Sequence, residues 1–581
     1  MRLYTITLLV LFCINSYSQI KIDENFTDWE ELDVLYSDAT GDGQPIDFGK
    51  LWLADDENYL YYCFEVGSEI NLQDNNDVTI YLDIDNNGAT GKSVNGIGAE
   101  IEYVFGERGG TRYTSAGNSS ISHTDLFLIT APTVTSTIFE GVIKKDLSGI
   151  GLGFDHDTIK VVLKDGNSGD MIPESGELLS YTLTNETTDY YEDYSIEKTD
   201  SSFLRFMTYN VERDGITDAQ KRQYFERMIT TLDPDIIAFQ EIYNSNANTI
   251  AGLVTSFFND GRNYFYGKKG PDNIILSKYP VVASYDIPSS SGFHGNGAFV
   301  VDMTEKYGVK ALVISAHTPC CDNNEARQDE IDAIMAFVRE AKSEGGTLTL
   351  DEESPIIIAG DMNLVGYSEQ LTTFLTGDIK NNSAYGDDFT PDWDNTPFDD
   401  AKPANPNLPL YFTWYDEGSS FAPGRLDFII YSGSVLDMLN SFSLFTPSMH
   451  PDTLSQYGLT VNDSKNAADH VPVIADFKLE LVTGGIKTGD SQLPKGIKLM
   501  QNYPNPFNPE TVIEYELGDA GEVSFKLISV TGELVETAGL GYKQDGKHSF
   551  KLNLSDLNSG VYFYQIASTG YISTRKLVLL K

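Results

Sequence analysis

The chain has 581 residues and carries 86 acidic against 40 basic side chains, a formal net charge of −46 at pH 7. This length predicts several domains, and a hydrophobic content of 41% excludes a disordered acidic chain. So large a negative charge also argues against non-specific electrostatic capture of nucleic acid or anionic lipid.

The first eighteen residues have the pattern of a secretory signal peptide. Met1-Arg2 supplies one positive charge, residues 8–12 an apolar core, and Ser16-Tyr17-Ser18 a small-x-small cleavage site. The apolar stretch is too short for a good membrane span. We therefore expect residues 1–18 to be removed, and the mature protein to be secreted or held at the cell surface.

Residues 19–195 predict an antiparallel β-sandwich. Short alternating strand patterns at 50–53, 58–62, 78–82 and 159–163 are separated by Asn, Asp and Gly turns. Cys63 lies in an apolar strand pattern, where a buried free thiol is expected.

An acidic turn follows one of these predicted strands. Asp83, Asp85 and Asn87 place hard oxygen ligands at alternate positions before Gly88, which predicts a structural calcium site in this domain. A solvated turn of Asp and Asn is an equally weighted alternative. This part of the chain also resembles family 9 carbohydrate-binding modules and related DOMON-like sandwiches, and the resemblance implies ligand or glycan binding. The other residues that carry it are Asp23, Trp29, Asp38, Gly41, Asp42, Thr90 and Gly91.

Residues 203–480 alternate buried strands with helical patterns, which predicts a mixed α/β domain. Thr217 and Gln220 predict a capping box at the start of one helix. A second helix is predicted before the strand at 356–358, and its apolar face consists of Ile331, Ile334, Met335 and Val338.

Polar residues stand where three buried strands of this domain end. Asn210 follows the strand pattern 206–209, Gln240-Glu241 follow 236–239, and Asp361-Met362-Asn363 follow 356–360. Carboxylates and amides held on rigid strands at a common rim suit a hard divalent cation. Each alone would be an ordinary cap or turn, but together they predict a site.

Two of the seven histidines adjoin such strands. His317 ends the apolar run 311–316, and His470 precedes the run 471–474. Imidazole can donate or accept a proton near neutral pH, as cleavage of a phosphodiester requires. Asp427 lies in an apolar run where an isolated carboxylate would be costly, so we predict that it partners His470.

This ordered set of motifs resembles the endonuclease/exonuclease/phosphatase superfamily from about Phe203 to Phe477. The resemblance implies a fold of two facing β-sheets flanked by helices, an α/β four-layer sandwich. The motifs are Thr208-Tyr209-Asn210-Val211, Gln240-Glu241, Ile275-Leu276-Ser277-Lys278-Tyr279-Pro280, His317, Gly360-Asp361-Met362-Asn363, Arg425-Leu426-Asp427-Phe428 and Asp469-His470-Val471-Pro472-Val473.

The resemblance also implies roles for individual residues. Glu241 would be the principal ligand of Mg²⁺, or of Mn²⁺ or Ca²⁺, supported by Asn210 and Asp469. Such an ion neutralises charge on the phosphoryl oxygens and activates a water.

The same resemblance assigns the catalytic groups. Asp361 and Asn363 would orient the water, hold the phosphate or bind a second ion. His470, polarised by Asp427, and His317 would serve as acid, base or phosphate contact, and the sequence leaves open which histidine does which.

Two departures from the family's motifs weaken the interpretation that DNA is the substrate. Residues 242–244 are Ile-Tyr-Asn where pancreatic-type nucleases tend to have an Arg, and residues 293–297 also lack an Arg found in many relatives. Cys320 and Cys321 lie in the loop after His317, separated from it by Thr318 and Pro319, and we interpret them as two loop thiols and not a bridge.

The end of the chain differs in composition from the rest. After a predicted linker at 481–494, residues 495–581 carry nine basic and nine acidic side chains and predict a small C-terminal β-sandwich. The segments 501–509, 531–532, 557–564 and 576–581 resemble the C-terminal sorting domain of type IX secretion substrates. The resemblance implies recognition by the type IX secretion machinery.

The sequence thus predicts a multidomain exported hydrolase of phosphoric esters. We expect a nuclease-like phosphodiesterase that uses a metal-activated water on nucleic acid, phospholipid or a small phosphoester. The alternatives are a sphingomyelinase-like or inositol-phosphate hydrolase, or an inactive surface protein that binds through its first domain.

Overall fold

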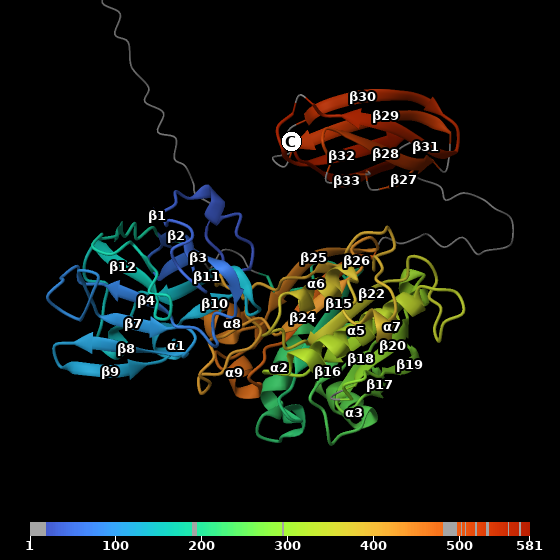
Figure 1. The fold of residues 1–581 in the computed structure, drawn as a ribbon. Helices are drawn as coiled ribbons and strands as arrows, with labels where there is room; N and C mark the ends of the chain where they lie inside the picture. The colour runs from blue at the N-terminus through green and yellow to red at the C-terminus, as the bar shows by residue number, and fades with distance from the viewer. Residues whose placement is uncertain are drawn as a thin grey trace, which may run out of the picture. The chain divides into compact units, whose positions relative to one another are not determined.

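The computed structural model describes residues 19–188, 195–292, 295–479 and, from 497 to 581, all but 501, 503, 506, 518–519, 530–533, 556 and 569–570. The predicted signal peptide, the predicted linker at 481–494, and residues 293 and 294 lie outside these ranges, as do tail-motif residues 501, 503, 506, 531 and 532. The chain divides near residue 482 into two compact units, which are described separately (Figure 1).

The first unit begins with a β-sandwich, as predicted, drawn in blue to cyan in Figure 1. One sheet has the order β1-β2-β3-β11-β10, the other β13-β12-β4-β7-β8-β9 with β14 beside β12, and β5-β6 form a separate hairpin. The strands are β1 Tyr36–Ser37, β2 Phe48–Asp55, β3 Tyr59–Ile70, β4 Val78–Asp83, β5 Lys92–Val94, β6 Ile97–Ala99, β7 Ile101–Val104, β8 Gly109–Thr114, β9 Gly117–Ile121, β10 Ile129–Ala131, β11 Ser136–Lys144, β12 Thr158–Asp165, β13 Met171–Ile172 and β14 Ser180–Thr182.

In the first half of β3, residues 60–64 are buried on both faces, which explains their uninterrupted apolar sequence. Leu60, Tyr62 and Phe64 point into the sandwich core. Tyr61 and Cys63, which alternate with them, pack in a second cluster with residues of the α/β domain. Cys63 is a buried free thiol, as predicted. The short helices of the sandwich are η1 Trp29–Glu31, α1 His123–Leu126 and η2 Ser148–Ile150.

The α/β domain contains two six-stranded sheets. Their orders are β17-β18-β16-β15-β26-β25 and β19-β20-β21-β22-β24-β23. The strands are β15 Leu204–Asn210, β16 Ile236–Gln240, β17 Phe265–Lys269, β18 Asn273–Ser277, β19 Val281–Ile287, β20 Asn296–Asp302, β21 Lys310–His317, β22 Ile356–Asp361, β23 Asp399–Asp400, β24 Asp427–Tyr431, β25 Leu436–Ser443 and β26 Val473–Leu479.

Packing clusters define four layers in this domain. Phe206 of β15 and Ile357 of β22 lie in the cluster between the two sheets. Met207 and Tyr209, on the opposite face of β15, pack with the apolar residues of α2 and α3. The outer face of β22 packs with α5, where the four predicted apolar residues are all buried. The predicted four-layer α/β sandwich is therefore confirmed.

The predicted capping box is wrong. Thr217 ends η3, where its hydroxyl donates to Asp214 O, and α2 starts five residues later. The helices of the domain are η3 Gly215–Thr217, α2 Arg222–Leu232, α3 Ala247–Phe257, α4 Thr304–Tyr307, α5 Asn324–Ala341, α6 Glu369–Thr376, α7 Asn382–Tyr385, η4 Thr446–Ser448, α8 Pro451–Tyr457 and α9 Asp463–Ala467. No helix among the described residues is both long and apolar enough to span a membrane.

The second unit is the small C-terminal β-sandwich, as predicted, drawn in red in Figure 1. A sheet β27-β28-β31 faces a sheet β30-β29-β32-β33 across a core that includes Tyr515, Phe525 and Tyr564. The strands are β27 Ile497–Leu499, β28 Glu510–Leu517, β29 Gly521–Ser529, β30 Leu534–Lys543, β31 Gly546–Asn553, β32 Gly560–Ser568 and β33 Tyr571–Leu579.

Candidate active site

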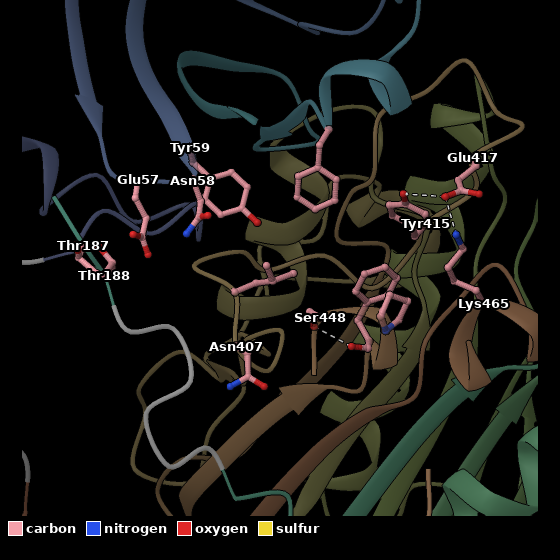
Figure 2. Close-up of a pocket in the computed structure, with 14 residues that line it drawn as sticks. Glu57, Asn58, Tyr59, Thr187, Thr188, Asn407, Tyr415, Glu417, Ser448 and Lys465 are labelled. Atoms are coloured by element: carbon pink, nitrogen blue, oxygen red, sulfur yellow. Dashed lines mark hydrogen bonds and ion pairs between the residues drawn. The ribbon is translucent and has the colours of Figure 1, made fainter. Parts of the chain in front are cut away.

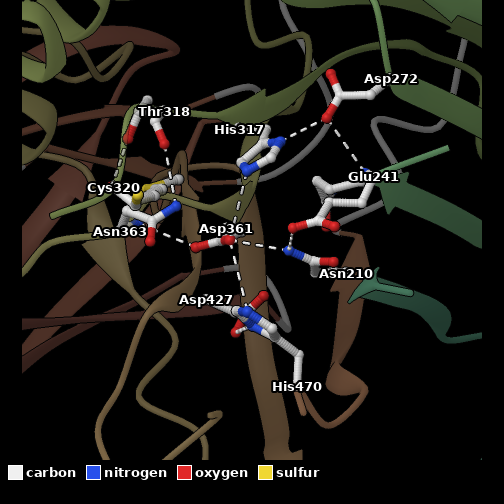
Figure 3. A network of polar contacts seen from close by, with 12 residues as sticks. Asn210, Glu241, Asp272, His317, Thr318, Cys320, Asp361, Asn363, Asp427 and His470 are labelled. Carbon is white, nitrogen blue, oxygen red and sulfur yellow. Dashed lines mark hydrogen bonds and ion pairs between the residues drawn. The ribbon is translucent and has the colours of Figure 1, made fainter. Parts of the chain in front are cut away.

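Strand register brings the predicted polar residues to one rim of the α/β domain. His317 and Asp361 are paired at the ends of the parallel strands β21 and β22, and Asp361 is opposite Asp427 of β24. In the facing sheet, Asn210 pairs with Gln240 at the ends of the parallel strands β15 and β16. Figure 3 shows the side chains of Asn210, His317, Asp361 and Asp427 converging from both sheets.

Asn210 links the two sheets at the centre of the site. Its amide Nδ2 donates to Asp361 Oδ2 at 2.9 Å and to Glu241 Oε1 at 3.2 Å. Glu241 has a positive φ of 63°, an uncommon conformation for a residue with a side chain. Its other oxygen accepts a hydrogen bond from Arg213 N at 2.8 Å. The turn therefore holds a partly exposed carboxylate against Asn210.

His317 is paired with Asp272, a residue that the sequence did not single out. His317 Nδ1 lies 2.5 Å from Asp272 Oδ2, and its Nε2 lies 3.7 Å from Asp361 Oδ2. Burial lowers the pKa of His317, but the bond to Asp272 and the charge of Asp361 outweigh it and raise this pKa to about 9.

His470 is paired with Asp427, as predicted. His470 Nδ1 lies 2.7 Å from Asp427 Oδ2, and its Nε2 lies 3.6 Å from Asp361 Oδ2. Burial lowers the pKa of His470, but the charges of Asp427 and Asp361 outweigh it and raise this pKa to about 10. The two histidines thus approach the same carboxylate oxygen, each oriented by a second carboxylate.

Asp361 itself is buried, and burial raises its pKa, although the positive charges of His470 and His317 oppose that rise. Asn363 lies beside it: its backbone N donates to Asp361 Oδ1 at 3.1 Å, and its side-chain amide donates to Thr318 O at 3.0 Å. Asp469 is placed differently. Its carboxylate accepts from Trp414 Nε1 at 3.1 Å, and it lies outside the close groups of acidic and histidine ligands found among the described residues.

The donor atoms suit a hard divalent cation. One ligand atom each from Glu241, His317 and Asp361 lies within 4.8 Å of the others, and Asp361, Asp427 and His470 form a second such group. Carboxylate oxygens are the ligands that Mg²⁺ prefers in proteins. The residues present therefore fit a magnesium-type ion held by Glu241 and Asp361.

Sequence reasoning missed Asp272 because it precedes its strand instead of ending one. Asp272 follows Gly270-Pro271, and such a sequence is typical of a turn. A usable signal was nonetheless present, since β18 pairs antiparallel with β16. That pairing puts the start of β18 next to Glu241, whose N lies 3.3 Å from Asp272 Oδ2.

The predicted calcium turn contains a buried acidic cluster. Asp83, Asp85 and Glu100 each offer a ligand oxygen within 4.8 Å of the others. Glu100 Oε2 accepts from Ile84 N at 3.0 Å, while Glu100 Oε1 is buried without a hydrogen-bond partner. The side-chain oxygen of Asn87, the third residue of the predicted turn, accepts from Ala89 N at 3.2 Å.

The two adjacent cysteines are free thiols, as predicted. Burial and the neighbouring thiol of Cys321 raise the pKa of Cys320 to about 12. A thiol with so high a pKa holds its proton at neutral pH, which makes it a poor nucleophile.

A cavity of about 640 Å³ lies where the sandwich meets the α/β domain, and its lining includes none of the residues described above as the site (Figure 2). Four aromatic side chains line it: Tyr59, Phe127, Tyr415 and Phe445. Since the perturbed histidines and the close carboxylates lie elsewhere, the chemistry of the side chains, and not the size of this cavity, defines the candidate active site.

Two parts of the chain match known protein families. Residues 207–443 match the Endonuclease/Exonuclease/phosphatase family. The chain carries an endonuclease/exonuclease/phosphatase domain. Residues 501–580 match the secretion system C-terminal sorting domain, which indicates export by type IX secretion to the cell surface or beyond.

Individual relatives are distant. An uncharacterized protein of Caenorhabditis elegans is 27% identical over 188 residues, which cover 29% of this chain and 56% of that protein. The chain thus spans about half the length of this curated relative.

Similar solved structures include ANGEL2, a 2′,3′-cyclic phosphatase (16% identity, 48% of this chain, 96% of that chain, TM-score 0.33). Sphingomyelinase C from Streptomyces griseocarneus is 14% identical, and the match covers 48% of this chain and 99% of that chain with a TM-score of 0.28. AP endonuclease from Leishmania major is 12% identical, and the match covers 48% of this chain and 88% of that chain with a TM-score of 0.28.

Proposed function

We propose that the α/β domain is a divalent-metal-dependent hydrolase of phosphoric esters that acts as a nuclease-like phosphodiesterase. The observation that carries the proposal is the pair of His–Asp dyads, His317–Asp272 and His470–Asp427, whose Nε2 atoms lie 3.7 and 3.6 Å from the same Asp361 oxygen. Cleavage of a phosphodiester moves one proton from the attacking water and one to the leaving oxygen. Two oriented imidazoles on one rim supply both transfers.

The carboxylates determine what each histidine can do. Asp272 and Asp427 hold Nδ1 of their histidines, so Nε2 of each ring is the atom presented to substrate. A protonated Nε2 donates to a phosphoryl or leaving oxygen, and a neutral one accepts the proton of the water. The raised pKa values favour the protonated form of both rings at neutral pH, so the ring that acts as the base must first lose its proton.

Glu241 and Asp361 would hold the ion, with the carbonyl oxygen of Asn210 and the carboxylate of Asp469 as the further ligands expected from the sequence. When bound, a divalent cation neutralises developing charge on the phosphoryl oxygens. Asn363, whose backbone N donates to Asp361, would position the phosphate or the water.

The charge of the chain favours short or small phosphodiesters over processive cleavage of a long polyanion. The net charge is −46, which repels nucleic acid at long range. Tyr243, in the segment where pancreatic-type nucleases tend to have an Arg, is 41% exposed next to the site. A phospholipid or an inositol phosphate is the alternative substrate, and the assay below separates these classes.

The test is hydrolysis by the mature protein of bis(p-nitrophenyl) phosphate, DNA, RNA, sphingomyelin and inositol phosphates, with Mg²⁺ and with EDTA. We expect phosphodiester cleavage that EDTA abolishes. Glu241→Gln and His470→Ala should each lower kcat by about 100-fold or more, in line with the loss of an ion ligand or a general acid or base.

Glu226→Gln is the matched control, because Glu226 is an exposed carboxylate of α2. It should leave kcat unchanged. Turnover that survives EDTA, or that survives both substitutions, contradicts the mechanism. A folded protein with no activity on any substrate supports the alternative of an inactive surface protein.

We also propose a structural calcium ion in the sandwich, held by Asp83, Asp85 and Glu100, with the Asn87 turn enclosing it. The supporting observation is Glu100 Oε1, which is buried without a partner beside two other carboxylates. Burying an unpaired charge is costly, and a hard cation with oxygen ligands removes that cost. Lys160, whose Nζ lies 3.3 Å from Asp83 Oδ2, offsets only part of the negative charge of the cluster.

A further inference from the structure

The N-terminal sandwich contacts the loop that follows the catalytic residue Asn363. Thr133 Oγ1 donates to Leu364 O at 2.7 Å, Asn71 Nδ2 donates to Val365 O at 2.8 Å, and Thr135 N donates to Gly366 O at 2.7 Å. The carbonyls of three consecutive loop residues thus accept hydrogen bonds from another domain.

The opposite side of this loop packs against α5. A Cβ added to Gly366 would lie 1.6 Å from Asn324 Oδ1, so the loop backbone is pressed against that helix. Residues 364–366 are therefore held between the sandwich and α5, starting one residue after Asn363.

The sandwich also contacts the hairpin 414–424, whose base lies at the site. The backbone of Trp414 forms isolated antiparallel β-bridges with Gly424 and with His470, and its side-chain Nε1 donates to Asp469. The tip of the hairpin meets sandwich residues: His123 Nε2 lies 2.9 Å from Ser419 O, and Gln73 Oε1 accepts from Ala422 N at 2.8 Å.

A buried ion pair makes the third contact. Arg425 is 2% exposed and two residues before Asp427. It is paired with Asp400 of its own domain at 2.7 Å and with Glu24 of the sandwich segment at 2.5 Å. Removing one partner of such a buried pair is strongly destabilising, so the start of β24 depends on the sandwich.

Thr133 lies between the two loops. Its hydroxyl binds Leu364 O, and its methyl group fills the space above Gly424, where an added Cβ would lie 2.4 Å from Thr133 Cγ2. One side chain of the sandwich therefore meets both the segment after Asn363 and the segment before Arg425.

We propose that the sandwich is a positioning element of the active site, with Thr133 as its principal positioning residue. Loops lose conformational entropy when they are ordered, and catalytic groups must be held to within a fraction of an ångström. The contacts from the sandwich hold the loop next to Asn363 and the strand that starts at Asp427. The change in kcat expected from this inference rests on the proposed hydrolase function, whereas the change expected in amide hydrogen exchange does not depend on it.

The test is Thr133→Val in the full chain, because valine keeps the methyl contact with Gly424 and removes only the hydroxyl. We expect kcat on bis(p-nitrophenyl) phosphate to fall by about tenfold with KM changed less than twofold, since a small misplacement of reacting groups mainly slows chemistry. Amide hydrogen exchange in residues 364–368 should rise, and Thr133→Ser should restore both readouts.

Thr137→Val is the matched control, because Thr137 is exposed at the start of β11, just after the connection that contains Thr133, and should change neither readout. Unchanged exchange at 364–368 in Thr133→Val overturns the proposal, as does an equal loss of kcat in Thr137→Val. Raised exchange in Thr133→Val, rescued by Thr133→Ser, supports it even if no substrate is turned over, and in that case only the proposed function fails.

Discussion

Asp272 is the residue on which the histidine assignment most depends. It accepts from His317 Nδ1 and lies against the backbone N of Glu241, so one buried carboxylate orients both a histidine and the turn of a proposed ion ligand. An unpaired charge at this position would be costly. His317 therefore stabilises Asp272 as much as Asp272 orients His317.

Replacing Asp272 tests this coupling. Asp272→Asn keeps the shape of the side chain but removes its charge, so we expect the pKa of His317 to fall from its raised value and kcat to drop by about 100-fold. Steady-state kinetics measures kcat, and NMR titration of the His317 ring measures the pKa. Asp437→Asn, an exposed carboxylate of β25, is the control. A kcat within twofold of the wild type would show that His317 needs no orienting carboxylate.

Residues that end buried strands could be predicted from the sequence, whereas those placed by tertiary contacts could not. Asn210, His317 and Asp361 follow clear apolar runs, and parallel strands bring such ends together. Asp272 and Glu100 come from the next strand along each sheet, so only the register reveals them. The contacts of Thr133 with Leu364 join residues 231 positions apart, which no local pattern encodes.

At the scale of elements, the strand pair β4–β7 builds the proposed calcium site. Asp83 ends β4, and Glu100 immediately precedes β7, with Glu100 N donating to Leu82 O at 3.0 Å. The antiparallel pairing of β4 with β7 thus brings the two carboxylates together at one end of the sandwich. The alternate spacing of oxygen ligands in the sequence located Asp83 and Asp85 of this cluster, but not Glu100.

Calcium binding should therefore stabilise the sandwich. We expect addition of 1 mM Ca²⁺ to the metal-free protein to raise the melting temperature of the wild type by about 5 °C, because an ion that binds only the native state stabilises it by mass action. Calorimetry measures the shift. It should vanish in Glu100→Gln and persist in Glu241→Gln, which separates this site from the active site. Glu107→Gln, an exposed neighbour, should behave like the wild type; a shift retained in Glu100→Gln would contradict the assignment.

The N-terminal sandwich and the α/β domain form one unit of the whole molecule. Tyr61 and Cys63 of β3 pack with Leu410 and Phe412, so the face of the sandwich on this side is covered by the α/β domain. Glycan binding by the sandwich stays a prediction, while its contacts with the active-site loops give it a second role. Several of the carboxylates that make up the net charge of −46 are buried in clusters, among them Asp83, Asp361 and Asp427, and a bound cation would reverse the local field there.

The C-terminal unit carries none of the residues proposed for catalysis. Its core is built entirely from residues 499–579, and its match is to a sorting domain. Removing residues 483–581 should therefore leave kcat/KM of the purified protein within about twofold of the full chain, since every proposed catalytic group lies before residue 480. The same deletion should prevent release from cells that have type IX secretion, measured by immunoblotting of medium and periplasm. The full-length chain in the same strain is the control, and a truncated protein that reaches the medium at the full-length level would show that another part of the chain directs export.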